Sequence, residues 1–202
     1  MSLIDRVKNI IITPKTEWDV INGEQPNPQA ILVGYVIPLV AIGAIASFIG
    51  WGLIGKSYGA LGYSWKVVGI GLGVRYAIIA LVAGIAGVYL TAFVIDALAT
   101  NFKSEKNFGK SFQLAAYAAT PGWVGAVFNI LPSLAIIGSL FGLYGLYLLY
   151  LGLPKLKKTP ADQVTVYFVV SLVAMIVAYF VIALILAAIL IPKVGSPGSL
   201  GL

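Results

Sequence analysis

The chain has 202 residues, of which 60% are hydrophobic and only 10% are charged, and its formal net charge is +6. Soluble domains carry about 25% charged residues, and a soluble fold of this length has too little interior to bury so much apolar surface. A bilayer accommodates that surface, so the composition predicts an all-α, polytopic membrane protein. The thirteen basic residues are scattered between apolar blocks and form no basic face, which argues against a nucleic-acid partner.

The residue types that most often carry catalysis or bind cofactors are missing from the sequence. It contains no cysteine and no histidine, which removes disulfides, thiolate nucleophiles, imidazole bases and the usual ligands of zinc, haem and iron–sulfur clusters. An aspartyl intramembrane protease needs two facing carboxylates, and Asp96 is the only acid near an apolar block. The sequence therefore predicts no enzyme, no catalytic or metal-binding residue and no cofactor.

Residues 1–29 precede the apolar blocks and are expected to form a cytosolic segment that ends in an extended linker. The segment begins with apolar residues at helical spacing, sharing an arc of about 120°: Leu3, Ile4, Val7, Ile10 and Ile11. This pattern predicts an amphipathic helix that lies on the inner leaflet, or else one that packs beneath the bundle. A second short helix is expected to begin at Pro14, with Thr13 as its N-cap.

Five apolar blocks follow, each long enough for the roughly 20 residues that a transmembrane helix needs. They form a predicted five-helix domain over residues 30–191, with residues 192–202 as a short exposed tail. Arg75 lies within the second block and is expected at the interface, with residues 66–75 as an entry segment. The predicted spans are residues 30–55, 67–95, 111–131, 133–153 and 164–191.

Lysine and arginine in the short connections orient these spans, because cytosolic loops carry the excess of positive charge. The side of the N-terminus receives Arg6, Lys8, Lys15, Lys103, Lys106, Lys110, Lys155, Lys157 and Lys158. The opposite side receives Lys56, Lys66, Arg75 and Lys193. This bias places the N-terminus in the cytosol and the C-terminus outside.

The cytosolic face holds the candidate contacts with partners or lipids. Asp96 ends the second span, where a carboxylate at a helix C-terminus is electrostatically unfavourable, and a lysine of the following loop would neutralise it. Asp96 is therefore either part of a site or an ordinary helix-end residue. Trp18 suits an interfacial anchor, and the lysines are expected to contact anionic headgroups at ~1 kcal/mol each. The full set is Arg6, Lys8, Trp18, Asp96, Lys103, Lys106, Lys110, Lys155, Lys157 and Lys158.

Small residues spaced four apart predict close helix packing, because they let helix backbones approach each other in lipid. We expect this packing within the monomer rather than in a dimer. Pro38 and Pro121 lie in the middle of predicted spans, where each removes a backbone hydrogen bond and kinks the helix. The predicted packing residues are Gly43, Ser47, Gly138, Gly142, Pro121 and Trp123.

Several segments resemble the Yip family of Ypt/Rab-interacting membrane proteins, in particular its prokaryotic members. Residues 13–18 (TPKTEW) are similar to the family's proline–tryptophan segment. Residues 108–112 (FGKSF) and 117–123 (YAATPGW) resemble its glycine-containing loop and Tyr-Ala-x-x-Pro core. Residues 144–158 are similar to the end of its fourth span, and Asp96 fits the acid that precedes the glycine loop.

The resemblance covers nearly the whole chain. It implies five spans, a cytosolic N-terminus and a prokaryotic cell membrane, and it carries no catalytic meaning. Eukaryotic members are associated with vesicle trafficking and prenylated Rab GTPases. GTPase binding is not transferred to this chain, because only 29 residues precede its first span.

Two hypotheses of function follow. The first is a non-enzymatic scaffold that organises the membrane or recruits partners, which would be anionic lipids, other membrane proteins or further copies of the chain. The alternative is a small transporter or channel component with a polar path on the third span. That path consists of Gln113, Tyr117, Thr120 and Asn129.

Overall fold

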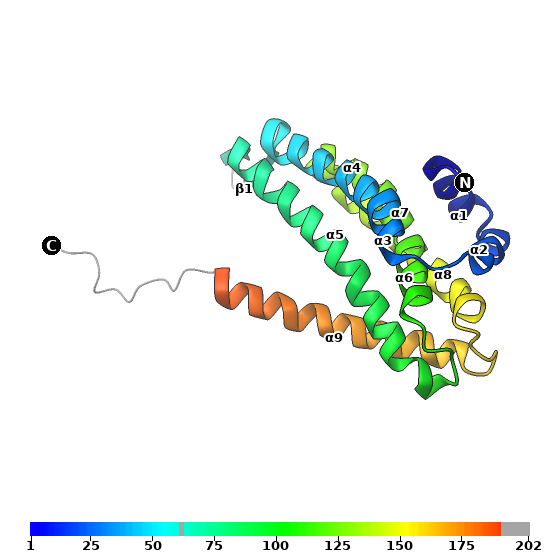
Figure 1. Ribbon diagram of the computed structural model, residues 1–202. Coiled ribbons are helices and arrows are strands. Elements are labelled where there is room, and N and C mark those ends of the chain that lie inside the picture. Colours follow the sequence, from blue (N-terminus) through cyan, green and yellow to red (C-terminus); the bar gives the residue numbers. More distant parts are fainter. Residues whose placement is uncertain (61–62, 191–202) are drawn as a thin grey trace.

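The computed structural model describes residues 1–60 and 63–190, which form a helical bundle with one short β-hairpin (Figure 1). The all-α prediction is confirmed at the level of fold class. The α-helices and strands are α1 (Leu3–Ile12), α2 (Pro14–Gly23), α3 (Pro28–Ile31), α4 (Ile37–Phe48), β1 (Lys56–Ala60), β2 (Tyr63–Val67), α5 (Ile70–Leu98), α6 (Phe108–Ala118), α7 (Thr120–Gly125), α8 (Ala135–Leu156) and α9 (Val164–Leu190). Shorter π- and 3₁₀-helical turns are η1 (Leu32–Val36), η2 (Ile49–Ile54), η3 (Ala99–Phe102), η4 (Ala126–Ile130) and η5 (Pro132–Leu134).

Four helices within the described residues are long and apolar enough to cross a membrane. They match the first, second, fourth and fifth predicted spans, and the protein is therefore a multi-pass integral membrane protein. Residues 111–131 instead divide among α6, α7 and η4, so the count of five spans stays a prediction. The end of the fifth predicted span and the tail over residues 192–202 lie outside the described residues. The four helices are Pro28–Ile54, Ile70–Phe102, Pro132–Leu156 and Val164–Ile182.

The two mid-span prolines explain the irregular backbone around them. Pro121 has no N–H for the carbonyl four residues earlier, and the chain ends α6 at Ala118 and starts α7 with Pro121 in its first turn. The effect of Pro121 is thus a break rather than the predicted kink. Pro38 stands in the first turn of α4 and follows the wide η1 turn, in which Ile37 N–H donates to the Leu32 carbonyl.

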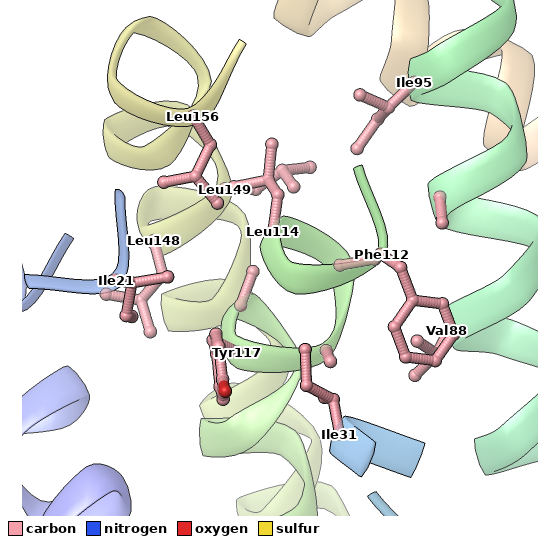
Figure 2. Close-up of a cluster of buried hydrophobic side chains, with 14 of the residues drawn as sticks. Ile21, Ile31, Val88, Ile95, Phe112, Leu114, Tyr117, Leu148, Leu149 and Leu156 are labelled. Carbon is pink, nitrogen blue, oxygen red and sulfur yellow. The ribbon is translucent and has the colours of Figure 1, made fainter. Parts of the chain in front are cut away.

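Helix α6 lies at the centre of the bundle. All of its residues from Ser111 to Ala118 are buried. Figure 2 shows Phe112 directed towards Val88 of α5 and Leu114 directed towards Leu149 of α8. Because the polar residues Ser111 and Gln113 are buried along with the apolar ones, α6 is enclosed by the helices around it.

The hairpin of β1 and β2 was not predicted. Its strands pair antiparallel, with Lys56 opposite Val67, and Tyr58 stacks on Trp65 with ring centroids 6.1 Å apart. The predicted entry segment over residues 66–75 is therefore divided between β2 and α5, and Arg75 is an exposed residue in the second turn of α5. Figure 1 shows this hairpin at the end of the bundle opposite to α1 and α2.

Helices α1 and α2 are separated at Thr13, as the Thr-Pro pattern predicts. Pro14 occupies the first turn of α2, but the Thr13 hydroxyl donates back to the Asn9 carbonyl at 3.2 Å instead of capping α2. One side of α1 packs on the protein through Ile10, which is fully buried. Ile4 of the predicted apolar stripe is 75% exposed.

Some of the predicted packing residues form close contacts between backbones. A Cβ on Gly43 would lie 2.9 Å from Ala126 Cβ of η4, and one on Gly138 would overlap the Gly125 carbonyl of α7. Gly142 differs, since a Cβ there would have no atom within 4 Å. Helix α8 therefore packs most closely on α7 at Gly138, whereas Gly142 lies beside Gly122, whose Cβ would be 3.9 Å from the Gly142 Cα. The other three predicted residues lie as follows: Ser47 donates to the Gly43 carbonyl at 2.9 Å, Pro121 is buried, and the Trp123 ring stands edge-on to Tyr35.

Candidate functional site

The most buried charge of the described chain is the ammonium group of Lys157, whose residue has 0% exposed surface. Lys157 Nζ donates to Asp96 Oδ1 at 3.0 Å, to Ser111 Oγ at 2.6 Å and to the Asn107 carbonyl at 3.1 Å. Asp96 lies in the last turn of α5, Ser111 in the first turn of α6, and Lys157 directly after α8. One side chain therefore joins the ends of three helices.

The partner of Asp96 is thus Lys157, and not a lysine of the loop that directly follows the second span, as the sequence suggested. The backbone brings the two loops together. The Glu105 N–H donates to the Lys157 carbonyl at 2.8 Å, and the Ser104 hydroxyl donates to Thr159 Oγ1 at 2.9 Å. These bonds hold the lysine loops after α5 and α8 against each other.

A buried serine beside a lysine raises the question of nucleophilic catalysis, which needs a neutral amine as base. Burial lowers the pKa of Lys157, and the hydrogen bond and charge of Asp96 oppose that effect. An ammonium has three N–H donors, and all three are used here. Ser111 is itself fully buried, so the arrangement acts as a structural connection between helices rather than as a nucleophile with its base.

A second ion-pair cluster attaches α1 and α2 to the bundle. Arg6 Nη1 lies 2.5 Å from Glu17 Oε1, and Arg6 Nη2 also pairs with Glu24. The guanidinium lies 5.2 Å from the centroid of the Tyr117 ring on α6. Lys110 Nζ donates to the Asn22 and Glu24 carbonyls, at 2.8 and 2.9 Å. Arg6 and Lys110 therefore direct their charges towards neighbouring parts of the chain.

Trp18 is fully buried, in contrast to the interfacial position that the sequence suggested. Its ring packs on α8 at Gly152, where a Cβ would lie 3.0 Å from the ring and would overlap Leu114 of α6. Glycine at position 152 therefore leaves the space into which the tryptophan fits. Trp18 acts as an internal link between α2, α6 and α8.

The remaining candidate contacts are exposed residues of α1, of α8 and of the loops after α5 and α8. Lys155 pairs with Asp19 at 2.6 Å and Lys158 pairs with Glu105 at 2.9 Å, and both pairs are exposed to solvent. Such exposed pairs contribute little to stability. The other exposed basic side chains of the set are Lys8, Lys103 and Lys106.

Two separate cavities lie along the predicted polar path. One of about 310 Å³ is lined by Gln113 and Tyr117, and another of about 240 Å³ is lined by Asn129. They share no lining residue. Thr120, the remaining residue of the path, bonds the Tyr35 hydroxyl at 2.7 Å.

Three segments of the chain meet at this end of the bundle. They are the first two helices with Trp18, the start of α6, and the end of α8 with Gly152 and Lys157. A family model described as the Yip1 domain matches residues 8–198, which include the end of α1, all of α2 with Trp18, the start of α6 and the end of α8. The chain belongs to the Yip1 domain family. Comparison with curated proteins found no match, and comparison with solved structures found none either.

The family match supports a multi-pass membrane protein and no known enzyme activity. A match to a family by sequence does not show which residues are in contact, and the site described here depends on contacts between residues far apart in the chain. Glu17, Glu24 and Ser111 were not among the predicted site residues, although they hold Arg6 and Lys157. The sequence offered one signal for the buried pair: a carboxylate such as Asp96, if it is buried, requires a cation from elsewhere in the chain.

Proposed function

We propose that this Yip1-domain protein is a non-enzymatic membrane scaffold that recruits anionic lipids and partner proteins at its cytosolic face. That face consists of the outer surface of α1 with the exposed lysines of the loops after α5 and α8. The observation that carries the proposal is that some basic residues are buried and others are exposed. Arg6 and Lys157 are buried in ion pairs that fix the surface, whereas Lys8, Lys103 and Lys106 are exposed on it.

The outer side of α1 combines apolar and basic groups. Ile4, Lys8 and Ile12 follow each other at intervals of four residues, and the two isoleucines are 75% and 66% exposed. Residues at this spacing share one helix face. Apolar side chains beside a lysine suit the boundary between headgroups and acyl chains, and the same surface suits an apolar, acidic groove on a partner protein.

The proposal includes an orientation. The nine basic residues of the N-terminal side favour a cytosolic N-terminus and a C-terminus outside, in a prokaryotic cell membrane. The position of α1 and α2 at the end opposite the hairpin supports two different sides for these elements (Figure 1). Homo-oligomers remain within the proposal as one kind of partner.

The test measures lipid selectivity of the full-length protein reconstituted in phosphatidylcholine vesicles. Spin-labelled phosphatidylserine is compared with spin-labelled phosphatidylcholine, and the motionally restricted fraction reports lipid at the protein surface. We expect the triple variant Lys8→Gln, Lys103→Gln, Lys106→Gln to lose several-fold selectivity for phosphatidylserine, at ~1 kcal/mol per lysine. Lys66→Gln on the hairpin is the matched control and should retain it. Equal selectivity in all three proteins would contradict the proposal.

The transporter or channel hypothesis is the second candidate, and the cavity at Gln113 and Tyr117 favours it. Against it, that cavity shares no lining residue with the one at Asn129, and the Tyr35–Thr120 hydrogen bond joins the first span to α7 beside Tyr117. A transport path also needs polar groups through the membrane depth. A flux of small polar solutes into proteoliposomes, abolished by Gln113→Leu, would favour this second candidate.

A further inference from the structure

A polar cavity of about 310 Å³ lies between the beginning of α1, the linker after α2, the first span and α6. The argument rests on five of its lining residues, which are Arg6, Glu24, Tyr35, Gln113 and Tyr117. This cavity is distinct from the exposed lysine surface to which the proposed function is assigned.

Gln113 is the residue that points to a ligand. It is 1% exposed, it lines the cavity, and its side-chain oxygen has no hydrogen-bond partner among the described residues. Buried side-chain amide oxygens in native proteins are normally hydrogen-bonded, so this unpaired oxygen, on a residue that lines a cavity, needs a partner. Tyr117 lies one helical turn further along the same face of α6, and it lines the same cavity.

The side-chain charges beside the cavity are already paired within the chain. The Arg6 guanidinium pairs with Glu17 and Glu24, and Lys110 Nζ bonds the Glu24 carbonyl. These two side-chain cations and two carboxylates satisfy one another, and Met1, with its α-ammonium, also lines the cavity. The side-chain groups of the cavity that are left for a ligand are therefore uncharged hydrogen-bonding groups, the Gln113 carboxamide and the Tyr117 hydroxyl.

The free groups indicate which uncharged chemistry fits. A carboxamide presents an N–H donor and a carbonyl acceptor side by side, and a phenol hydroxyl both donates and accepts. Two adjacent hydroxyl groups on one ligand match this set, since each also donates and accepts. The Tyr35 and Tyr117 rings, whose centroids are 4.9 Å apart, form an aromatic wall of the cavity and suit the C–H surface of a polyol.

We propose that this cavity binds a vicinal-diol group of a polyol, held by the Gln113 carboxamide and the Tyr117 hydroxyl. Two sources supply such a group at the membrane surface: the headgroup of a lipid such as phosphatidylglycerol or phosphatidylinositol, and a water-soluble sugar or glycerol. The inference concerns a defined pocket with neutral recognition chemistry. It stands apart from charge-based lipid contact, and either proposal can fail without the other.

The experiment uses the full-length protein in nanodiscs and has two arms. In the lipid arm, native mass spectrometry compares retention of phosphatidylglycerol and phosphatidylinositol with that of phosphatidylserine, which is anionic but has no vicinal diol. In the soluble arm, saturation-transfer NMR measures binding of glucose and glycerol in phosphatidylcholine nanodiscs. We expect the diol-bearing ligands of at least one arm to bind in preference to their controls.

Two variants tie that preference to the cavity. Gln113→Leu removes the carboxamide, and Tyr117→Phe keeps the ring and removes only the hydroxyl. Each should weaken retention about three- to tenfold, the effect of one lost hydrogen bond. Asn129→Leu is the matched control, because it lies on the same polar run but lines a different cavity. Equal retention of diol and non-diol lipids with no sugar or glycerol binding would overturn the proposal, as would binding unchanged in both variants.

Discussion

Lys157 Nζ lies 3.0 Å from Asp96 Oδ1, and this bond joins the loop after α8 to the last turn of α5 with no part of the lysine side chain exposed. The end of α8 next to Lys157 also contacts α2, where the Trp18 ring packs on Gly152. The pair neutralises a carboxylate at a helix C-terminus, a position that would otherwise be unfavourable. The hydrogen bonds from Glu105 to Lys157 and from Ser104 to Thr159 hold the loops after α5 and α8 against each other beside this pair.

Removing either partner of this pair should destabilise the protein strongly. Lys157→Met leaves Asp96 as an uncompensated buried charge, and the expected loss is about 3–5 kcal/mol in the free energy of unfolding. Lys158→Met is the matched control, because Lys158 forms only an exposed pair with Glu105 and should change stability by less than about 1 kcal/mol. Denaturant unfolding of the protein in detergent, followed by circular dichroism, measures both. Similar losses in the two variants would contradict the structural role of the buried pair.

The double variant Lys157→Met with Asp96→Leu separates charge from packing. It removes both buried charges together, so it should recover most of the stability that Lys157→Met loses. A double variant as unstable as the single one would show that the lysine contributes through packing and its bonds to Ser111 and Asn107.

Adding one methyl group at Gly152 should be costly, because its Cβ would overlap Leu114 and crowd the Trp18 ring. We expect Gly152→Ala to lose about 1–3 kcal/mol by overpacking. Gly142→Ala on the same helix has open space and should be neutral or gain up to roughly 1 kcal/mol from helix propensity. The midpoints of thermal unfolding in detergent compare the two. Equal midpoints for the two variants would show that Trp18 does not depend on this contact.

Arg6 should control how firmly α1 and α2 are attached. Arg6→Leu leaves the buried Glu17 carboxylate unpaired, so these helices should unfold locally and let trypsin bind the backbone at Lys15, whose side chain is already exposed. Cleavage after Lys15 is expected to become about tenfold faster or more. Lys8→Leu removes an exposed lysine of the same helix and should leave that rate unchanged. The rate is followed by mass spectrometry of the released N-terminal peptide, and the idea fails if both variants are cut at the wild-type rate.

The proposed orientation can be tested cleanly because the sequence contains no cysteine. Ser57→Cys places a single thiol on the exposed hairpin, and Glu105→Cys places one on the exposed loop after α5. In intact cells, a membrane-impermeant maleimide should label Cys at position 57 and spare Cys at position 105. Labelling of both from the outside, or of position 105 alone, would overturn the orientation derived from the charge bias.

Much of the architecture follows from local sequence pattern. The apolar blocks locate the long helices, because about 20 apolar residues suffice to cross a bilayer. The Thr13-Pro14 step separates α1 from α2, because proline fits the first turn of a helix. The segments that resemble the Yip family identify the family without any contact being known.

The candidate site was harder to derive, because it depends on residues far apart in the chain. The sequence singled out Asp96, Trp18 and Arg6 but placed the last two on the surface, where a tryptophan and an arginine are ordinary. The structure buries both, since Gly152 leaves room for the indole and Glu17 compensates the guanidinium. No local pattern distinguishes Lys157 from the neighbouring Lys158, although one is fully buried and the other exposed.

The sequence by itself therefore determined that this is a helical, multi-pass membrane protein of the Yip1 family. Composition and periodicity suffice for the membrane-spanning helices, because burial in lipid depends on summed apolarity, and the family follows from the sequence motifs. Only the tertiary structure decided which charges lie inside, that α6 is enclosed by its neighbours, and that a polar cavity lies against Gln113. These properties depend on which helices touch, and a hydrogen bond such as that from Lys157 to Asp96 exists only when packing brings residues 61 positions apart to within 3.0 Å.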